Sequence, residues 1–288
     1  MRKLFSILAV LGVIAGIAGW LLSAPRPLDP EALAGLTGDA ARGAPVFWAA
    51  GCAGCHAAPE AEGDAKLVLS GGYRMESPFG TFIAPNISPS PAGIGGWSTL
   101  DLANALIAGV SPKGAHYYPA LPYTTYQRMT LQDAVDLKAF LDTLPPSDVA
   151  SLPHEVGFPF NIRRGLGLWK LAFLDPSWTQ GDAPERGRYL VEALGHCAEC
   201  HTPRNAVGVL DRSQWLQGAP NPSGKGKIPG INSGTLTWSA ADIAYYLETG
   251  FTPDFDSAGG SMTDVIAHMA KLTPEDRTAI AEYLKTVP

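Results

Sequence analysis

Two short stretches decide the fold of this sequence: "AAGCAGCHAAP" at residues 49–59 and "LGHCAECHTPR" at residues 194–204. Each contains two cysteines separated by two residues, with a histidine directly after the second cysteine. These four cysteines are all that the 288-residue sequence contains. A pattern that uses every cysteine in two matching motifs indicates a shared chemical task.

Covalent haem attachment explains the motif best. Two thiols at this spacing on a helical turn can add across the vinyl groups of one haem, and the next histidine becomes the proximal ligand of the iron. A zinc site would need four ligands, but the two cysteine pairs lie in separate repeats. A dithiol redox pair would favour a βαβ setting and has no use for the histidine. We therefore expect two covalently bound haem c groups, on Cys52, Cys55, His56, Cys197, Cys200 and His201.

The sequence repeats itself at a spacing of about 141 to 145 residues, which aligns more than the cysteine motifs. Each copy predicts a short helix that starts near Asp39 or Asp182 and ends at the cysteine motif. A loop with Asn and Ile then leads to a second helix with a serine N-cap and an acid three residues later. A last amphipathic helix begins at a threonine. The expected caps are Ser98, Ser239, Thr130 and Thr273.

A membrane helix is expected at the N-terminus, over residues 1–26. Leu4 to Ala24 is an uncharged, mostly apolar run of about the ~20 residues that a spanning helix needs. Arg2 and Lys3 before it favour a cytoplasmic N-terminus and an exported remainder. A cleaved signal peptide is the alternative, although its apolar region is usually only ~7–15 residues.

The sequence indicates the second protein ligand of each iron less clearly than it indicates the histidine. Met262 is expected to bind the second iron opposite His201, and Met269 matches core packing instead. The first half has Leu121 where a methionine would be expected. Met129 is the preferred candidate there. The alternatives are His116, Met75 or an open position.

Other side chains are expected around the haems or at the surface. Trp97 and Trp238, which the repeat pairs, are candidates to donate indole N–H groups to haem propionates, or simply to pack on the haem edge. Arg204 is a candidate propionate partner, with plain exposure as the alternative. The remaining histidines are expected at the surface or in capping positions: His154, His196 and His268.

Composition excludes one class of partner. The net charge is −6, and no run rich in Lys and Arg appears, so nucleic-acid binding is not expected.

The sequence resembles the membrane-associated multihaem cytochrome c subunits of bacterial alcohol, aldehyde and gluconate dehydrogenases, and their two-haem relatives. The resemblance covers about 240 residues from the region of Asp39 and rests on "SPFGTFIAPNISPSPAGIGGWS", "YYPALPY", "FPFNIRRGLGLWK", "CAECHTPR" and "GGSMTDVIAHMAKLTPEDRTAIAEYL". Those subunits typically carry three haem domains and usually have Met where Leu121 stands, whereas this sequence has two motifs.

The resemblance implies an all-α protein with two tandem class I cytochrome c-like domains, at residues 37–146 and 182–288, behind the N-terminal helix. Residues 147–181 are expected to form a packed linker, because Phe158, Phe160, Trp169 and Phe173 would not be left in water.

The resemblance also implies a function and a place. The chain is expected to be an electron carrier and not an enzyme, held in the bacterial inner membrane by one helix with its haem domains in the periplasm. It would take electrons from a dehydrogenase and pass them to the respiratory chain through a quinone, a cytochrome or an oxidase. The alternative is a dihaem enzyme, a peroxidase or sulfur-compound oxidoreductase, in which one iron has an open or displaceable position.

Overall fold

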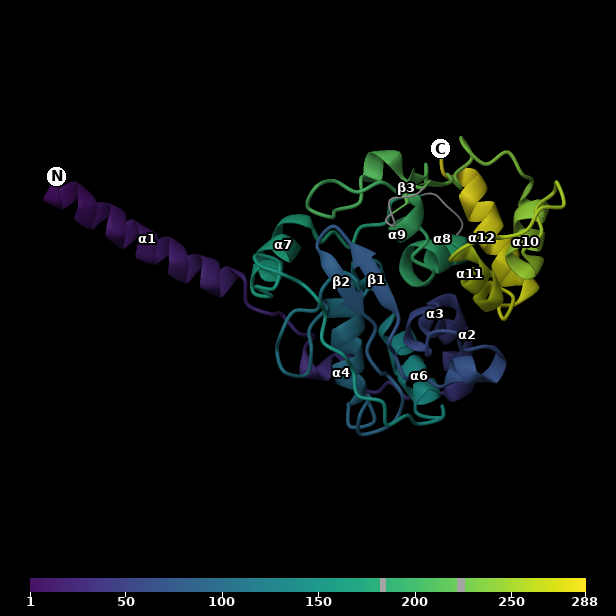
Figure 1. Cartoon of the computed structure of the whole chain (residues 1–288), viewed down its shortest axis with the longest axis horizontal. Coiled ribbons are helices and arrows are strands. Elements are labelled where there is room, and N and C mark those ends of the chain that lie inside the picture. Colours follow the sequence, from purple (N-terminus) through teal and green to yellow (C-terminus); the bar gives the residue numbers. More distant parts are fainter. Residues whose placement is uncertain (182–184, 222–225) are drawn as a thin grey trace.

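The computed structural model describes residues 1–181, 185–221 and 226–288. Figure 1 shows a mostly helical body from which one long helix, α1 (Arg2–Leu22), projects. No residue of α1 is buried in the body, and the helix is long and apolar enough to cross a membrane. The body has two halves of similar design, joined by a linker.

The first half runs from α2 to α6. A short 3₁₀ turn, η1 (Pro30–Leu33), precedes it, and one antiparallel hairpin interrupts the helices with Arg74 opposite Ile83. Its elements in chain order are α2 (Ala40–Ala49), α3 (Cys52–His56), η2 (Gly63–Leu67), β1 (Arg74–Ser77), β2 (Gly80–Ile83), α4 (Thr99–Ala103), the π-helical turn η3 (Asn104–Ala108), α5 (Tyr123–Tyr126) and α6 (Leu131–Leu141).

The second half runs from α8 to α12 and follows the same plan. Its predicted start at Asp182 lies outside the described residues. Its elements are α8 (Glu185–Tyr189), the π-helical turn η4 (Leu190–Leu194), α9 (Ala198–His201), η5 (Arg212–Gln214), β3 (Ala219–Pro220), β4 (Lys227–Ile228), α10 (Ala240–Thr249), α11 (Met262–Met269) and α12 (Pro274–Thr286).

A glycine lets the first and last helices of each half cross at close range. A Cβ on Gly43 of α2 would lie 2.1 Å from the carbonyl oxygen of Asp136 in α6. A Cβ on Gly187 of α8 would lie 2.0 Å from that of Ala279 in α12. Both distances are shorter than any real contact, so only glycine fits. The same crossing in both halves is the structural counterpart of the sequence repeat.

The predicted helix caps are confirmed. The hydroxyl groups of Ser98 and Ser239 accept hydrogen bonds from the third helical N–H, and the acids there bond back to the serine N–H to complete a capping box. Thr130 and Thr273 cap α6 and α12 through their hydroxyl oxygens. These short-range bonds fix where the helices start.

The linker carries helix α7 (Gly165–Phe173) and differs from the expectation in one respect. Its aromatic side chains were predicted to be buried, but Phe158 is 81% exposed, and Phe160 and Phe173 are 47% and 43% exposed. Trp169 is half-buried. The prediction assumed that apolar side chains are always buried inside the protein. In this segment, three of the four aromatic side chains lie at the surface instead.

Candidate haem-binding sites

Both cysteine motifs lie on a single helical turn that a residue with a positive φ precedes. Gly51, with φ of 63°, separates α2 from the turn that carries the first motif. His196, with φ of 40°, stands at the same place before Cys197. A non-glycine residue rarely adopts this conformation, so the second turn is held by its surroundings. Each motif turn contributes one buried alanine, Ala53 or Ala198, to the hydrophobic core.

The two motif histidines are held in the same way. Nδ1 of His56 lies 2.8 Å from the carbonyl oxygen of Pro85, and Nδ1 of His201 lies 2.7 Å from that of Pro229. A carbonyl only accepts hydrogen bonds, so Nδ1 carries the proton and Nε2 keeps a free lone pair. Burial lowers the pKa of both imidazoles, against a smaller opposite effect of the carbonyl, and so favours the neutral form that binds a metal. Each histidine is therefore prepared as an axial ligand.

A hydrogen bond to its own backbone carbonyl also holds each motif histidine in place. The N–H of Gly71 donates to the carbonyl of His56 at 2.7 Å, and the N–H of Gly218 donates to that of His201 at 2.8 Å. Both glycines have positive φ, and a Cβ on either would come within 2.7 Å of backbone atoms. Sequence reasoning missed the proline carbonyls. The signal was present, because a proline stands at the same repeat position in "APNI" and "IPGI".

The thiols are unlike those of a redox-active pair. Burial raises the pKa of Cys52 and Cys197 to about 12 and that of Cys55 to about 11. Reactive dithiols instead have a lowered pKa at one cysteine. Within residues 1–181, 185–221 and 226–288, no group of three or more His, Cys, Asp or Glu side chains is placed to hold a metal ion such as zinc. The residues present fit thioether attachment of haem and a histidine ligand.

The candidates for the second axial ligand occupy different elements. Met262 is the first residue of α11 and packs half-buried against the core. Met129 lies just before α6 and is only 5% exposed, in the same core. Nε2 of His116 lies 2.9 Å from the carbonyl oxygen of Ser23, so this ring is engaged at the end of α1. Met269, expected in the core, is buried.

The two tryptophans that the repeat pairs have different surroundings. Trp97 and Pro85 line one cavity of about 390 Å³, which connects the tryptophan to the loop that holds His56. Trp238 is half-buried and packs edge-on against Tyr246, with the ring centroids 5.2 Å apart. Propionate contacts of both indoles stay a prediction.

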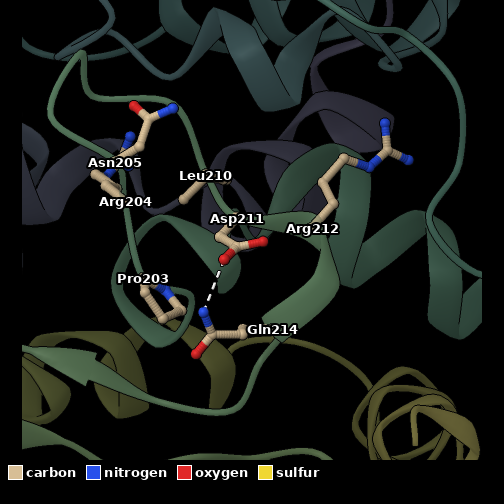
Figure 2. A pocket seen from close by; sticks show the side chains of 7 residues that line it. All are labelled: Pro203, Arg204, Asn205, Leu210, Asp211, Arg212 and Gln214. Atoms are coloured by element: carbon tan, nitrogen blue, oxygen red, sulfur yellow. Dashed lines mark hydrogen bonds between the residues drawn. The ribbon is translucent and has the colours of Figure 1, made fainter.

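Arg204 has protein partners. Its guanidinium forms an ion pair with Glu199, between the cysteines of the second motif, and donates to the carbonyl of Gly208 at 2.8 Å. It also lines a cavity of about 430 Å³ directly after the motif, where the carboxylate of Asp211 accepts from the amide of Gln214 (Figure 2). A propionate contact of Arg204 stays a prediction, and it would compete with Glu199.

Two of the remaining histidines are not at the surface. His268 is 3% exposed, and its ring packs 5.7 Å from that of Trp48 in the first half. His196 is half-buried, with Nε2 3.2 Å from the carbonyl of Ala50. The expectation of exposure was wrong because the two halves pack against each other here. His154 is partly buried and accepts a bond from the N–H of Ile83 at 3.1 Å.

The two motifs adjoin across the boundary between the halves. The carboxylate of Glu199 accepts hydrogen bonds from Thr124 at 2.7 Å and Thr125 at 3.0 Å, both on α5 of the first half. A Cβ on Gly54, inside the first motif, would lie 3.1 Å from His268. Residues of both halves form one hydrophobic core. The halves therefore hold the two attachment turns next to each other.

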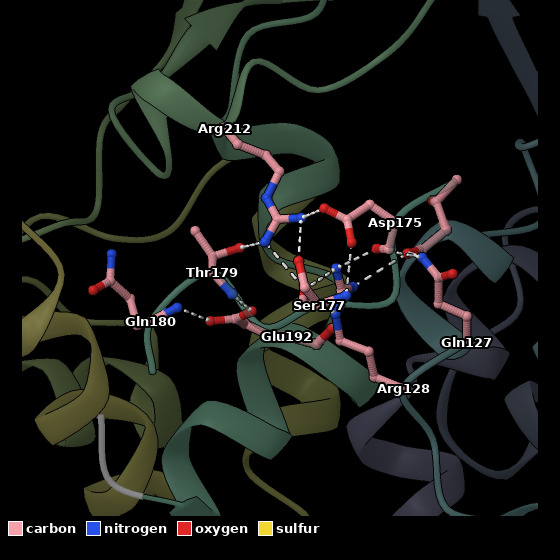
Figure 3. Close-up of polar contacts among 9 residues, drawn as sticks. Gln127, Arg128, Asp175, Ser177, Thr179, Gln180, Glu192 and Arg212 are labelled. Carbon is pink, nitrogen blue, oxygen red and sulfur yellow. Dashed lines mark hydrogen bonds and ion pairs between the residues drawn. The ribbon is translucent and has the colours of Figure 1, made fainter. Parts of the chain in front are cut away.

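The end of the linker, around Ser177, forms hydrogen bonds with both halves (Figure 3). Arg128 of the first half and Arg212 of the second half both donate to the carbonyl oxygen of Ser177, at 3.0 Å each. The buried carboxylate of Glu192 accepts from the N–H of Thr179 at 2.7 Å. Because one short segment bonds to both halves, it fixes their relative position.

The repeated fold and the paired motif sites define a class of protein, and comparison with known families agrees. The cytochrome c family model matches residues 40–145 and 184–288, and the chain belongs to this family. It holds two covalently bound haem c groups.

Individual relatives narrow the class further. The chain is 59% identical to a diheme cytochrome c-type protein of Cereibacter sphaeroides, over all of this chain and 99% of the relative. It is 37% identical to the fructose dehydrogenase cytochrome subunit of Gluconobacter japonicus, over 91% of this chain and 55% of that subunit. It is 34% identical to the cytochrome c subunit of a quinone alcohol dehydrogenase of Gluconobacter oxydans, over 86% and 54%. The chain thus spans about half the length of these dehydrogenase subunits.

Proposed function

We propose that this chain carries electrons from a dehydrogenase to the respiratory chain. The observation that carries the proposal is the pair of equivalent motif turns, in which His56 and His201 are each bonded to a proline carbonyl and which adjoin across the boundary between the halves. Relatives that are named as cytochrome subunits of fructose, alcohol and gluconate dehydrogenases support a dehydrogenase as the donor. A quinone, another cytochrome or an oxidase is the proposed acceptor.

The protein's part in this work is to hold each ligand set rigid. Haem c, when bound, supplies one-electron chemistry. The carbonyls of Pro85 and Pro229 hold the imidazoles in one tautomer and orientation, which reduces the rearrangement that accompanies a change of charge at the site. Glu199 joins the second motif to α5 of the first half and keeps the distance between the sites constant. Both features suit a carrier.

The axial ligands on the opposite faces complete the proposal. We assign Met262 to the second iron and Met129 to the first, because both side chains pack against the core that surrounds the motifs. A thioether in that position raises the reduction potential and closes the iron to small molecules. His116 stays the alternative: its Nε2 is bonded to the carbonyl of Ser23, and its Nδ1 is buried without a hydrogen-bond partner.

Helix α1 is proposed to anchor the chain in the bacterial inner membrane as a single span. Its 21 residues, at about 1.5 Å each, are about 30 Å long, which matches the hydrocarbon core. The positive charges of Arg2 and Lys3 support a cytoplasmic start under the positive-inside rule, and we propose that both halves lie in the periplasm.

Optical spectra of the reduced holoprotein with and without carbon monoxide test the carrier proposal. Two closed irons predict that the gas leaves the spectrum unchanged. Binding at one haem would contradict the carrier assignment and support the alternative dihaem enzyme, in which Leu121 leaves the first iron open.

A further inference from the structure

Helix α7 has an unusual polarity for the surface of a soluble protein. Its sequence, "GLGLWKLAF", has one charged residue, Lys170. Leu168 and Leu171, one turn apart, are 44% and 52% exposed, and Phe173 is 43% exposed. Helices at a protein surface normally turn polar residues to the outside and apolar residues to the core. This helix presents a continuous apolar face outward.

The inward contacts of α7 prevent it from turning that face into the protein. The ammonium group of Lys170 donates to the carbonyls of Ala108 and Gly109 at 2.8 and 2.7 Å. On the same side, a Cβ on Gly167 would lie 2.2 Å from the carbonyl oxygen of Ser23. The one charged side chain and the closest backbone approach both point inward, so the exposed leucines are a fixed feature of the fold.

The segment directly before α7 adds to the exposed apolar surface. Phe158 is 81% exposed, Phe160 47% and Ile162 53%. Isolated exposed apolar residues need no explanation, but a run of them that continues into the face of a helix marks an interaction surface.

The position of α7 identifies what covers this surface. Figure 1 shows α7 beside the place where α1 joins the body. Arg164, at the start of α7, donates to the carbonyl of Trp20 at 2.6 Å and to the hydroxyl of Ser23 at 3.0 Å, and its guanidinium lies 4.2 Å from the centre of the Trp20 ring. These contacts tie α7 to the last turn of α1.

A spanning α1 puts its last turn at the boundary between hydrocarbon and water. Tryptophan is enriched at that depth. Because Arg164 at the start of α7 contacts Trp20 and Ser23 directly, α7 lies at nearly the same depth as the end of α1. An arginine such as Arg164, whose apolar stem lies near the membrane while its guanidinium reaches polar groups, is typical of this boundary.

We propose that α7 is an interfacial membrane helix, with Leu168, Leu171 and Phe173 embedded among the lipids next to the end of α1. The proposal rests on the membrane anchor proposed above. It means that the protein has a second contact with the membrane, which restricts rotation about α1 and holds the first half against the membrane surface.

Spin-label accessibility in the full-length holoprotein tests this placement. A nitroxide would be attached to Leu171→Cys in nanodiscs of phosphatidylethanolamine and phosphatidylglycerol; the native cysteines are occupied by thioether bonds. Leu168→Cys is a second reporter if the first variant yields no holoprotein. Tyr245→Cys is the matched water control, because Tyr245 is 55% exposed on α10, on the far side of the body from α1. Ile14→Cys reports on α1 itself.

The expected result is a several-fold higher ratio of oxygen to nickel-chelate collision rates at position 171 than at position 245. If position 14 is embedded but position 171 matches the water control, the interfacial helix is wrong while the anchor stands; such a face would be left for a protein partner. If position 14 is also open to the nickel chelate, the proposed anchor fails, and the interfacial helix fails with it.

Discussion

The two halves of the molecule agree closely on one side of each haem site and differ on the other. On the histidine side, Pro85 corresponds to Pro229 and the close glycine crossing at Gly43 corresponds to that at Gly187. For the opposite side, the sequence repeat aligns Leu121 of the first half with Met262, which begins α11 in the second half. The residues that attach haem can vary little between the halves, because the two cysteines, the histidine and the backbone carbonyl that holds the histidine are all needed. The residue that binds the iron on the opposite face would set the potential and the access of small molecules, and there the proposed ligands of the two halves differ in position.

The largest expected effect concerns the shared helix crossing. Gly43→Ala and Gly187→Ala should each lower the free energy of unfolding by more than about 2 kcal/mol, because the new Cβ would meet a backbone carbonyl at 2.1 or 2.0 Å. Chemical denaturation followed by circular dichroism measures the change. Gly96→Ala is the control, since its Cβ meets nothing within 4 Å, and it should stay within about 0.5 kcal/mol of the parent. Destabilisation by only one of the two crossing variants would show that the halves do not share this construction.

A second prediction concerns His268, through which the second half packs on the first. Burial lowers its pKa to about 4, with Lys66 and His196 adding to the decrease and Asp264 opposing it. Since the unfolded chain binds a proton near pH 6.5 and the folded chain does not, this group's contribution to stability is present above pH 6.5 and is lost as the pH falls toward 4.

The loss amounts to at most about 3 kcal/mol over that interval. Denaturation midpoints of the parent and of His268→Gln, measured between pH 7 and pH 4, check it: the variant should depend less steeply on pH. Parallel curves for the two proteins would rule out a protonation-sensitive contact at this position.

The ligand variants address the difference between the halves directly. Met262→Ala should remove the thioether-to-iron charge-transfer band of the second haem and lower its potential by on the order of 100 mV, because a thioether favours the reduced iron. Met129→Ala should do the same to the first haem only. Absorption spectra and potentiometry of both variants measure this. An unchanged spectrum for Met129→Ala would make His116→Ala the next variant and would refute the assignment of Met129.

Features that depend on residues close together in the chain could be predicted from the sequence. The capping boxes of Ser98 and Ser239 and the haem turns depend on residues a few positions apart, so the pattern of residue types was sufficient to predict them. The apolar helix α1 was predicted for the same reason, from length and composition. The two short hairpins were not predicted, because four-residue and two-residue strands carry little periodic signal.

Contacts between segments far apart in the chain could not be predicted from the sequence. His268 was expected at the surface, but its burial depends on Trp48 and Gly54, more than 200 residues away in the chain. The exposed Phe158 and Phe173 were expected in the core because the sequence states how apolar a segment is and not what surrounds it. The carbonyls of Pro85 and Pro229 were missed because the repeated proline does not by itself show which side chain its backbone carbonyl will contact.

A potentiometric titration of the purified holoprotein, followed by haem absorbance, tests most directly the claim that the two halves attach haem alike but complete its coordination differently. The proposed thioethers come from different surroundings, since Met129 before α6 is only 5% exposed and Met262 on α11 is half-buried, so the two haems should titrate in two one-electron steps at separable potentials. A single potential shared by both haems would contradict this account.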